Sequence, residues 1–205
     1  AENRYIAEDA VEKIKVEYEP IPALTDPYQA LEEEGILIHP ELGDNIQASF
    51  HISIGDVNDS LGASDHTIKS KFIIPRVSGN PIETRGVVAT YDSRIEELKI
   101  WSATQSVHMV RSYVSKALGL AEENIRVISP DIGGGFGTKG AIYPEEVLIP
   151  YLAIKYNRSI RWIEDRLEYF IGSMHSRDQI HEVEVGFQKD GMISALKVHF
   201  VQDVG

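Results

Sequence analysis

The chain contains no cysteine among its 205 residues. This absence excludes disulfide bonds, a cysteine nucleophile, a zinc site built from thiolates and an iron–sulfur cluster held by the chain itself. It also removes the usual indication of redox compartment. The sequence has no apolar run of the roughly 18 residues that a helix needs to cross a bilayer.

Basic residues are few relative to acidic ones, with 20 Lys and Arg against 32 Asp and Glu and a formal net charge of −12. An acidic surface repels the phosphates of nucleic acids and of anionic lipids. We therefore expect neither a nucleic acid nor a membrane as a partner. A hydrophobic fraction of 42% and a charged fraction of 25% are ordinary for a globular protein and exclude a disordered chain.

The beginning of the chain is only partly regular. Apolar spacing and alternation predict, in order, a helix over 7–14, a strand over 15–19 and a short helix over 26–31. From 35 to about 65 the chain is rich in Gly, Asp, Asn and Ser, which is typical of a linker. The start without methionine and the abrupt end indicate a fragment, or one piece of a subunit encoded in parts.

From residue 66 onward the pattern is regular. Alternating or continuous apolar residues predict strands over 66–75, 86–91, 98–101, 125–128, 159–163, 180–187 and 192–201. Apolar residues spaced by three and four, together with start signals, predict helices over 106–118, 144–156 and 164–171. Asp190-Gly191 predicts the turn between the last two strands.

A glycine-rich loop between the strand 125–128 and the helix 144–156 most directly indicates chemistry. It reads Asp131-Ile132-Gly133-Gly134-Gly135-Phe136-Gly137-Thr138-Lys139-Gly140. Glycines let the backbone approach a ligand and point consecutive N–H groups at it, and the helix that follows favours phosphate. Each N–H given to a charged oxygen contributes about 1.5–3 kcal/mol. With Lys139 adding positive charge and Phe136 expected to be buried, the loop predicts a binding site for a pyrophosphate-containing ligand.

Residue spacing alone leaves a second interpretation open, a Rossmann-type NAD(P)-dependent oxidoreductase. Gly135, Gly137 and Gly140 match G-x-G-x-x-G, and Glu164 ends the next strand near the distance of about 20 residues expected of a ribose-binding acid. Against it, residues 129–134 separate the strand from the first glycine of that motif. Pro144 also delays the helix, so that Gly140 would not contact it.

Two coupled motifs carry a family resemblance: Trp101-Ser102-Ala103-Thr104-Gln105, and the run from Arg126 to Lys139 that contains the glycine loop. Supporting pieces occur in order at 81–84, at 161–166 and around His175 and Arg177. Together they are similar to the molybdopterin-binding region of molybdenum hydroxylases, the family of xanthine dehydrogenase, aldehyde oxidase and CO dehydrogenase large subunits. The resemblance covers nearly the whole chain and is strongest to CO dehydrogenase-like and archaeal aldehyde-oxidising members.

The resemblance implies specific site residues. Gln105 matches a glutamine whose side-chain amide lies beside an oxygen ligand of molybdenum, where it donates a hydrogen bond without a competing charge. Phe136 and Gly137 match residues whose backbone N–H groups face the metal centre and its pterin. Gln105 is thus the expected catalytic residue, and the expected cofactor-binding residues are Gln105, Gly133, Gly134, Gly135, Phe136, Gly137, Thr138 and Lys139. No residue of the chain is expected to ligate the metal, because the sulfurs of the pterin hold it.

The same resemblance implies cofactors, partners and a reaction. The cofactor is molybdopterin with molybdenum, as the cytosine dinucleotide, while iron–sulfur clusters and FAD are expected only on partner subunits. Iron–sulfur and flavin subunits, the remaining part of the large subunit and a small-molecule substrate are the expected partners, in the cytoplasm. The reaction is hydroxylation of an aldehyde or similar small carbonyl substrate using water, or oxidation of CO. Gly140 replaces the acidic residue of purine-oxidising relatives, which disfavours a purine, and we expect the chain alone to be inactive because the general base of the family lies outside it.

The predicted fold class is α+β, with an incomplete small N-terminal domain followed by the first part of a mixed α+β molybdopterin-binding domain. We expect residues 1–62 to be the C-terminal remnant of a hammerhead-like domain and a linker, and residues 63–205 to begin the molybdopterin-binding domain. A third interpretation, a non-catalytic scaffold subunit, predicts an exposed apolar patch where a missing part packs.

Other polar residues give weaker signals. His108, His175, His181 and His199 match no ligand spacing, so no metal site is expected. Glu83, close to Pro81, is expected to make structural hydrogen bonds rather than to catalyse. Asp165 and Arg166 are expected to cap the short helix that follows.

Overall fold

A computed structural model describes residues 2–32 and 35–204. By its contacts the chain divides into unit 1, comprising Ala1–His66 and Gly186–Ala195, and unit 2, comprising Thr67–Val185 and Leu196–Gly205. In the described part of the chain, the helices are all too short or too polar to span a membrane. The predicted boundary between 62 and 63 concerns evolutionary domains and stays a prediction.

Unit 1 has little regular structure. Its elements are the helix α1 (Arg4–Val11), the 3₁₀ turns η1 (Gln29–Leu31) and η2 (Pro40–Leu42), and the helix α2 (Val57–Gly62). The helix predicted over 7–14 therefore begins and ends three residues earlier than expected. The strand predicted over 15–19 is wrong. Alternation forms a strand only where a neighbour pairs with its backbone, and Val16 and Tyr18 lie exposed.

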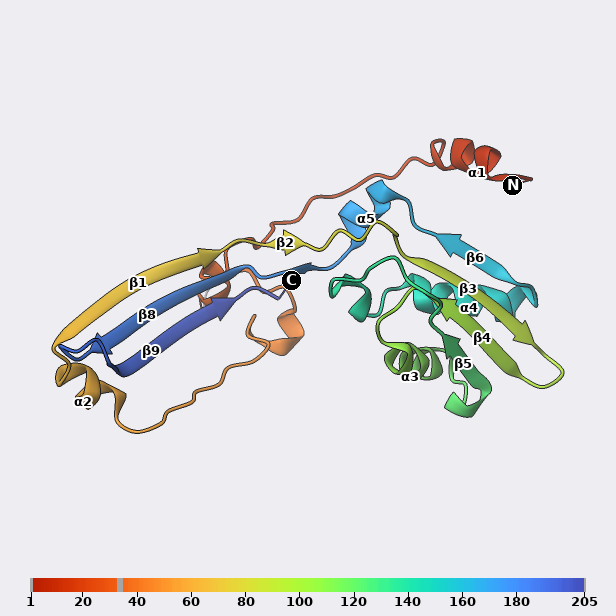
Figure 1. The fold of residues 1–205 in the computed structure, drawn as a ribbon. Helices are drawn as coiled ribbons and strands as arrows, with labels where there is room; N and C mark the ends of the chain where they lie inside the picture. Colours follow the sequence, from red (N-terminus) through yellow and green to blue (C-terminus); the bar gives the residue numbers. More distant parts are fainter. Residues whose placement is uncertain (1, 33–34, 205) are drawn as a thin grey trace. The chain divides into compact units, whose positions relative to one another are not determined.

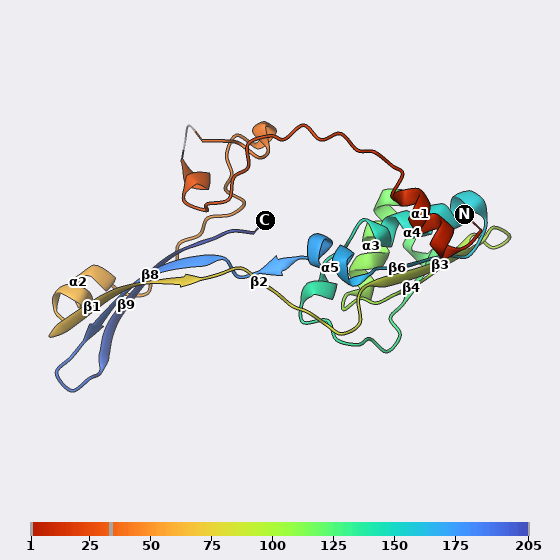
Figure 2. The ribbon, with the colours of Figure 1, turned by 90° about the horizontal axis from the view of Figure 1, so that it is seen from above.

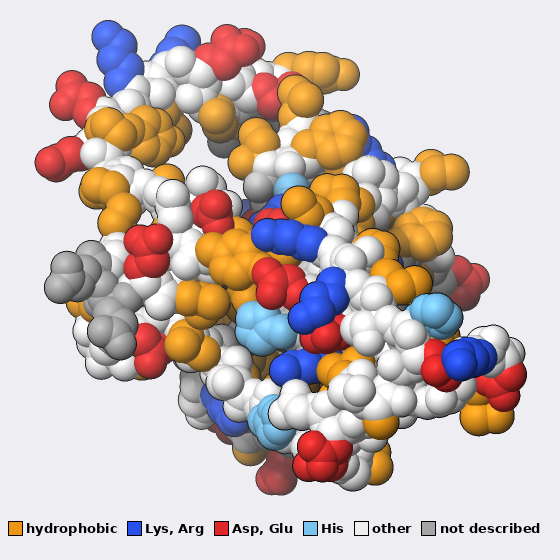
Figure 3. All heavy atoms as spheres, turned by 90° about the vertical axis from the view of Figure 1, so that its left-hand side faces the viewer, with side chains coloured by type: hydrophobic (Ala, Val, Ile, Leu, Met, Phe, Trp, Pro, Cys, Tyr) orange, Lys and Arg blue, Asp and Glu red, His pale blue; other side chains and the backbone are white. Residues whose placement is uncertain are grey.

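Unit 1 buries few apolar side chains. Within residues 2–32 and 35–66, every residue whose burial is described is exposed or half-buried. Tyr18, Ile21 and Ile54 are 85%, 81% and 89% exposed. Figure 3 shows hydrophobic side chains, in orange, distributed among acidic and basic ones over the visible face. The residues that form the hydrophobic core lie instead in unit 2.

Unit 2 contains a four-stranded sheet of order β5-β4-β3-β6. The central strand β3 (Gly86–Asp92) is antiparallel to β4 (Glu97–Ser102) and to β6 (Ile160–Ile163), whereas β5 (Ile125–Ile128) is parallel to β4. The observed ranges of these strands agree with the predicted ranges to within one or two residues (Figure 1).

Two helices cover this sheet. The helices α3 (Val107–Leu118) and α4 (Glu145–Tyr156) contact each other and pack on it, and Figure 2 shows them on the same side of the sheet. Alternate strand residues and helix residues spaced by four form one core, made of Val87, Ala89, Leu98, Ile100, Val110, Val114, Ile125, Ile149 and Ala153. The hydrophobic pattern in the sequence thus predicted the elements that build this core.

The remaining elements complete an α+β fold, as predicted. A three-stranded sheet of order β1-β8-β9, largely in unit 2, consists of β1 (His66–Ile74), β8 (Gln179–Phe187) and β9 (Ile193–Gln202). The short strands β2 (Val77–Ser78) and β7 (His175–Ser176) pair antiparallel, and at two residues each they are too short to leave a periodic signal. The 3₁₀ turns η3 (Glu122–Asn124) and η4 (Thr138–Gly140) and the helix α5 (Arg166–Gly172) complete the element order.

Candidate functional site

The two motifs singled out in the sequence meet at one edge of the four-stranded sheet. Since β4 and β5 are parallel neighbours, with Trp101 paired to Ile128, the segments after their carboxyl ends leave the sheet side by side. Ser129 Oγ donates a hydrogen bond of 3.0 Å to the Thr104 carbonyl and joins these segments. The carboxyl ends of adjacent parallel strands are a common place for ligand sites in α/β sheets.

Gln105 is held against the glycine loop by its backbone and its side chain. Its N–H donates to the Lys139 carbonyl at 2.8 Å, and its Oε1 accepts the Gly137 N–H at 3.1 Å. A Cβ atom on Gly135 would lie 2.6 Å from Cδ of Gln105, so only glycine leaves room for this side chain. With its oxygen fixed toward Gly137, the exposed carboxamide keeps both N–H donors of Nε2 without a partner in the described part of the chain.

The middle of the loop presents further donors. Gly134, Phe136 and Gly137 have positive φ values of 93°, 50° and 87°. In the structure as described, the backbone N–H groups of Gly134, Gly135 and Phe136 donate to no protein acceptor. Three successive unpaired N–H groups beside the unpaired NH2 group of Gln105 form a donor-rich, uncharged surface suited to anionic or oxo ligands.

The expectation that Phe136 is buried is wrong, because its side chain is 75% exposed. A positive φ is unusual for a residue with a Cβ atom and is typical of segments that surrounding contacts hold in place. Here the contact is close: a Cβ atom on Gly79 would lie 3.0 Å from Cβ of Phe136.

Lys139 and Glu83 form an ion pair between a buried and a partly exposed side chain. The Lys139 side chain is fully buried, and its Nζ donates to Glu83 Oε2 at 2.7 Å. The same oxygen accepts the Gly133 N–H at 2.8 Å. Burial raises the pKa of Glu83, but the hydrogen bonds from Lys139 and Gly133 outweigh it and leave that pKa below its usual value. The Lys139 ammonium is thus committed to Glu83, which has the hydrogen-bonding role expected of it.

Two tyrosines fasten the end of the loop. The buried Thr138 hydroxyl bonds to the Gly135 carbonyl at 2.9 Å and to the Tyr169 hydroxyl at 2.8 Å. The Tyr143 hydroxyl donates to the Thr138 carbonyl at 2.6 Å. The sequence analysis missed both tyrosines, since an isolated aromatic residue gives no sign of a partner elsewhere in the chain.

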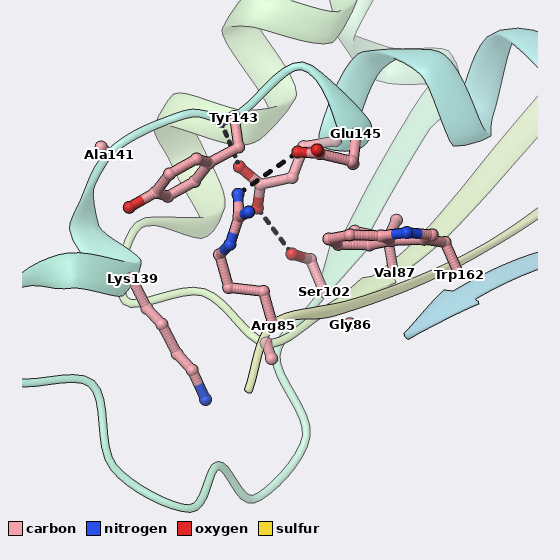
Figure 4. Close-up of a pocket in the computed structure, with 11 residues that line it drawn as sticks. Arg85, Gly86, Val87, Ser102, Lys139, Ala141, Tyr143, Glu145 and Trp162 are labelled. Carbon is pink, nitrogen blue, oxygen red and sulfur yellow. Dashed lines mark hydrogen bonds and ion pairs between the residues drawn. The ribbon is translucent and has the colours of Figure 1, made fainter. Parts of the chain in front are cut away.

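Behind the loop, Arg85 organises a buried polar cluster (Figure 4). Its guanidinium forms an ion pair with Glu164, contacts Glu145 at 3.2 Å and lies 3.6 Å from the ring centre of Tyr143. Figure 4 shows the ammonium end of Lys139 directed away from this guanidinium. The cavity in the cluster is about 10 Å³, roughly the space of one water.

The neighbouring carboxylate Glu146 is also buried. Ser102 Oγ donates to it at 2.6 Å and the Tyr143 N–H at 3.1 Å. Burial raises the pKa of Glu146, and these two hydrogen bonds offset only part of that shift.

The Rossmann interpretation is wrong. Glu164 is 2% exposed and engaged with Arg85, so it cannot reach a ribose. Two of the three strand pairings in the sheet are antiparallel, whereas a dinucleotide fold requires a parallel sheet. Gly140 lies in the turn η4, away from the start of α4, as the position of Pro144 indicated.

Asp165 and Arg166, which the sequence also singled out, make structural hydrogen bonds. Asp165 caps α5 through a capping box with Glu168, as predicted, whereas Arg166 donates to the carbonyls of Pro81 and Ile82. Across the described residues, no three His, Asp or Glu side chains gather in a way that could hold a metal ion.

Residues 38–205 match the family model of the molybdopterin cofactor-binding domain. The chain is 33% identical to the nicotine 6-hydroxylase large subunit of Paenarthrobacter nicotinovorans, and the match covers all of this chain and 25% of that protein. It is 34% identical to the carbon monoxide dehydrogenase large chain of Afipia carboxidovorans, and this match covers all of this chain and 27% of that protein. The solved structure of reconstituted CO dehydrogenase from Oligotropha carboxidovorans superposes with a TM-score of 0.86 at 35% identity, over 98% of this chain and 26% of that one. The chain therefore spans about a quarter of the length of these relatives.

Proposed function

The chain belongs to the molybdopterin cofactor-binding family of molybdenum hydroxylases, and on this premise we propose that it forms part of the molybdenum-cofactor-binding large subunit of an oxidoreductase. The reaction we propose is hydroxylation of an aldehyde or similar small carbonyl substrate with water, or oxidation of CO. In this proposal Gln105 and residues 133–139 contact the cofactor.

The observation that carries the proposal is the cluster of unpaired donors on Gln105 and the glycine loop. Oxo groups, pterin carbonyls and phosphates are acceptors, and the described protein atoms leave the Nε2 of Gln105 and three loop N–H groups unpaired. A side chain at Gly135 would fill the space that Gln105 occupies, so the residues present fit the group. Molybdopterin with molybdenum supplies two-electron redox chemistry when bound.

The residues of this chain position the cofactor and do not themselves react. The Gly137 N–H fixes the Gln105 oxygen, which turns the two Nε2 donors outward. The Lys139 carbonyl fixes the Gln105 backbone. A preorganised amide donor stabilises negative charge on a neighbouring oxygen without rearranging during the reaction. Gln105 is thus the residue we assign to the reacting centre.

Two relatives are named as a large subunit and a large chain, which supports a place for this chain in a larger assembly. We propose the cytosine dinucleotide form of the cofactor, iron–sulfur and flavin subunits as partners, and a cytoplasmic complex. The remaining part of a large subunit supplies the general base and most of the substrate pocket.

A second candidate substrate class is a nitrogen heterocycle. Two relatives are named nicotine 6-hydroxylase large subunit and 6-hydroxypseudooxynicotine dehydrogenase complex subunit gamma, at 33% and 37% identity. Both candidates use the same cofactor contacts, and substrate turnover by the assembled enzyme distinguishes them.

The test is the molybdenum and pterin content of the protein purified in its assembly. Gln105→Ala removes a donor, and Gly135→Ala displaces the Gln105 carboxamide without altering the core. Each lost hydrogen bond to a charged oxygen weakens cofactor binding by about tenfold or more. Gly140→Ala is the matched control, because its added Cβ atom meets nothing within 4 Å. A metal-free wild-type assembly, or equal cofactor content in all three variants, would overturn the proposal.

A further inference from the structure

Glu83 lies outside the predicted cofactor contacts, yet it joins both ends of the glycine loop. One carboxylate oxygen, Oε2, accepts the N–H of Gly133 and the ammonium of Lys139. These two residues are the first and last of the segment assigned to the cofactor. A single side chain therefore links the two ends of the loop.

The buried Lys139 ammonium requires its ion pair with Glu83. Its side chain is fully buried, and Glu83 is the partner that the structure describes for it. A buried charge without a partner is strongly unfavourable, so the loop keeps this conformation only while Glu83 stays ionised and in place.

Close packing also fixes the start of the loop. A Cβ atom on Gly133 would lie 2.6 Å from Cβ of Glu83, so glycine is needed where the loop crosses this side chain. The Glu83 N–H in turn donates to the Gly133 carbonyl at 3.4 Å. The two residues thus exchange hydrogen bonds in both directions.

The segment that carries Glu83 is itself anchored on both sides. Arg166 donates to the carbonyls of Pro81 and Ile82 at 2.7 and 2.8 Å. Thr84 Oγ1 donates to the Glu164 carbonyl at 2.7 Å. Glu83 therefore projects from a backbone tied to β6 and α5, which makes it a fixed point for a loop rich in glycine.

The contacts continue from Glu83 to the reacting centre. Lys139 accepts the Gln105 N–H through its carbonyl, and Gly137, two residues before it, holds the Gln105 oxygen. We infer that Glu83 is a positioning residue that acts through the buried Lys139 and Gly133 to hold the glycine loop and Gln105 in their cofactor-binding geometry. This inference rests on the proposed function.

The test measures the loop and the cofactor separately in the assembled protein. Glu83→Gln keeps an oxygen for Gly133 and Lys139 but removes the charge that compensates the buried ammonium. We expect exchange of the paired amides of Gly133, Gly137 and Thr138 to accelerate by about tenfold or more, with a parallel loss of molybdenum and pterin. Glu97→Gln is the charge-matched control, since it breaks the partly exposed Glu97–Lys99 ion pair on β4.

A rescue separates positioning from general damage to the fold. Lys139→Met removes the buried charge, so the double variant Glu83→Gln with Lys139→Met should recover the slow backbone exchange that Glu83→Gln alone loses. Exchange in Glu83→Gln equal to that in Glu97→Gln, or a double variant no better than Glu83→Gln, overturns the inference.

The two readouts distinguish this inference from the proposed function. If exchange responds as expected but the wild-type assembly contains no molybdopterin, the Glu83 contacts stand and the proposed function fails. If the wild type contains the cofactor and exchange does not respond, the proposed function stands and the role of Glu83 fails.

Discussion

Two regions of the chain differ in how their apolar residues are used. In residues 86–163, apolar positions recur with the periods of strands and helices, and they enter one core beneath α3 and α4. In residues 2–66, every residue with described burial is exposed or half-buried, and the only α-helices described there are α1 and α2, of 8 and 6 residues. Hydrophobic content and local alternation, as over 15–19, are therefore not enough to form a core; a segment also needs neighbouring elements that pair with its backbone and pack on it.

The difference bears on the interpretation of the chain as a scaffold. Apolar residues of unit 1 such as Ile21 and Ile54 are exposed and not packed in a core. We propose that further parts of a longer large subunit cover them, which agrees with the chain spanning about a quarter of its relatives. A scaffold contribution and a cofactor-binding role are compatible.

The largest difference between the two regions is expected when a buried residue of the core is truncated. Ile100→Ala empties a fully buried position on β4 and should lower the free energy of unfolding by about 2–5 kcal/mol. Ile54→Ala, at an 89% exposed position, should change it by less than about 0.5 kcal/mol. Both tryptophans, Trp101 and Trp162, lie on the four-stranded sheet, so denaturant unfolding followed by tryptophan fluorescence reports on this region. Equal effects of the two substitutions would contradict the difference between the regions.

A smaller effect compares two helix caps of the same residue type. Asp165 caps α5, which buries Tyr169, and Asp56 caps α2, which buries no residue. Asp165→Ala should lower the free energy of the same transition by about 1 kcal/mol. Asp56→Ala should leave the tryptophan transition within about 0.5 kcal/mol of the wild type, because α2 contributes nothing to the core. A larger loss from Asp56→Ala would show that unit 1 supports the sheet.

The smallest expected effect is a pH dependence from Glu146, because two hydrogen bonds offset part of its burial. Since its pKa is raised in the folded state, its stabilising contribution is complete below the pKa of an unfolded glutamate, near 4.3. That contribution is lost as pH rises through the higher folded-state pKa. Glu146→Gln can accept from Tyr143 and donate to Ser102, so it should remove the dependence. The free energies of unfolding of wild type and variant, measured from pH 4 upward, should diverge in favour of the variant; parallel curves would exclude the effect.

Much of the fold could be predicted from the sequence. The ranges of β3, β4, α3, β5 and α4 agree with the predicted ones because each element repeats its apolar signal several times. The strand expected over 15–19 failed because alternation over five residues does not specify a pairing partner. The pair β2 and β7 gave no signal at all.

Some residues of the candidate site could be identified from the sequence, but their orientation and their partners could not. The two motifs identified Gln105 and the glycine loop, and the structure brings Gln105, Gly135 and Gly137 into contact. The orientation of Phe136 was wrong, because a positive φ is a property of the whole loop rather than of one residue. The partners of Lys139 and Glu164 could not be predicted, since each lies more than fifty positions away in the sequence.

The periodic elements, the family and the place of the glycine loop follow from the order of residues along the chain, because each depends on near neighbours. The pairing of Lys139 with Glu83, the pairing of Glu164 with Arg85 and the outward NH2 group of Gln105 depend on the folded arrangement. A buried charge must be paired, and the partner within reach depends on how strands distant in sequence are brought together.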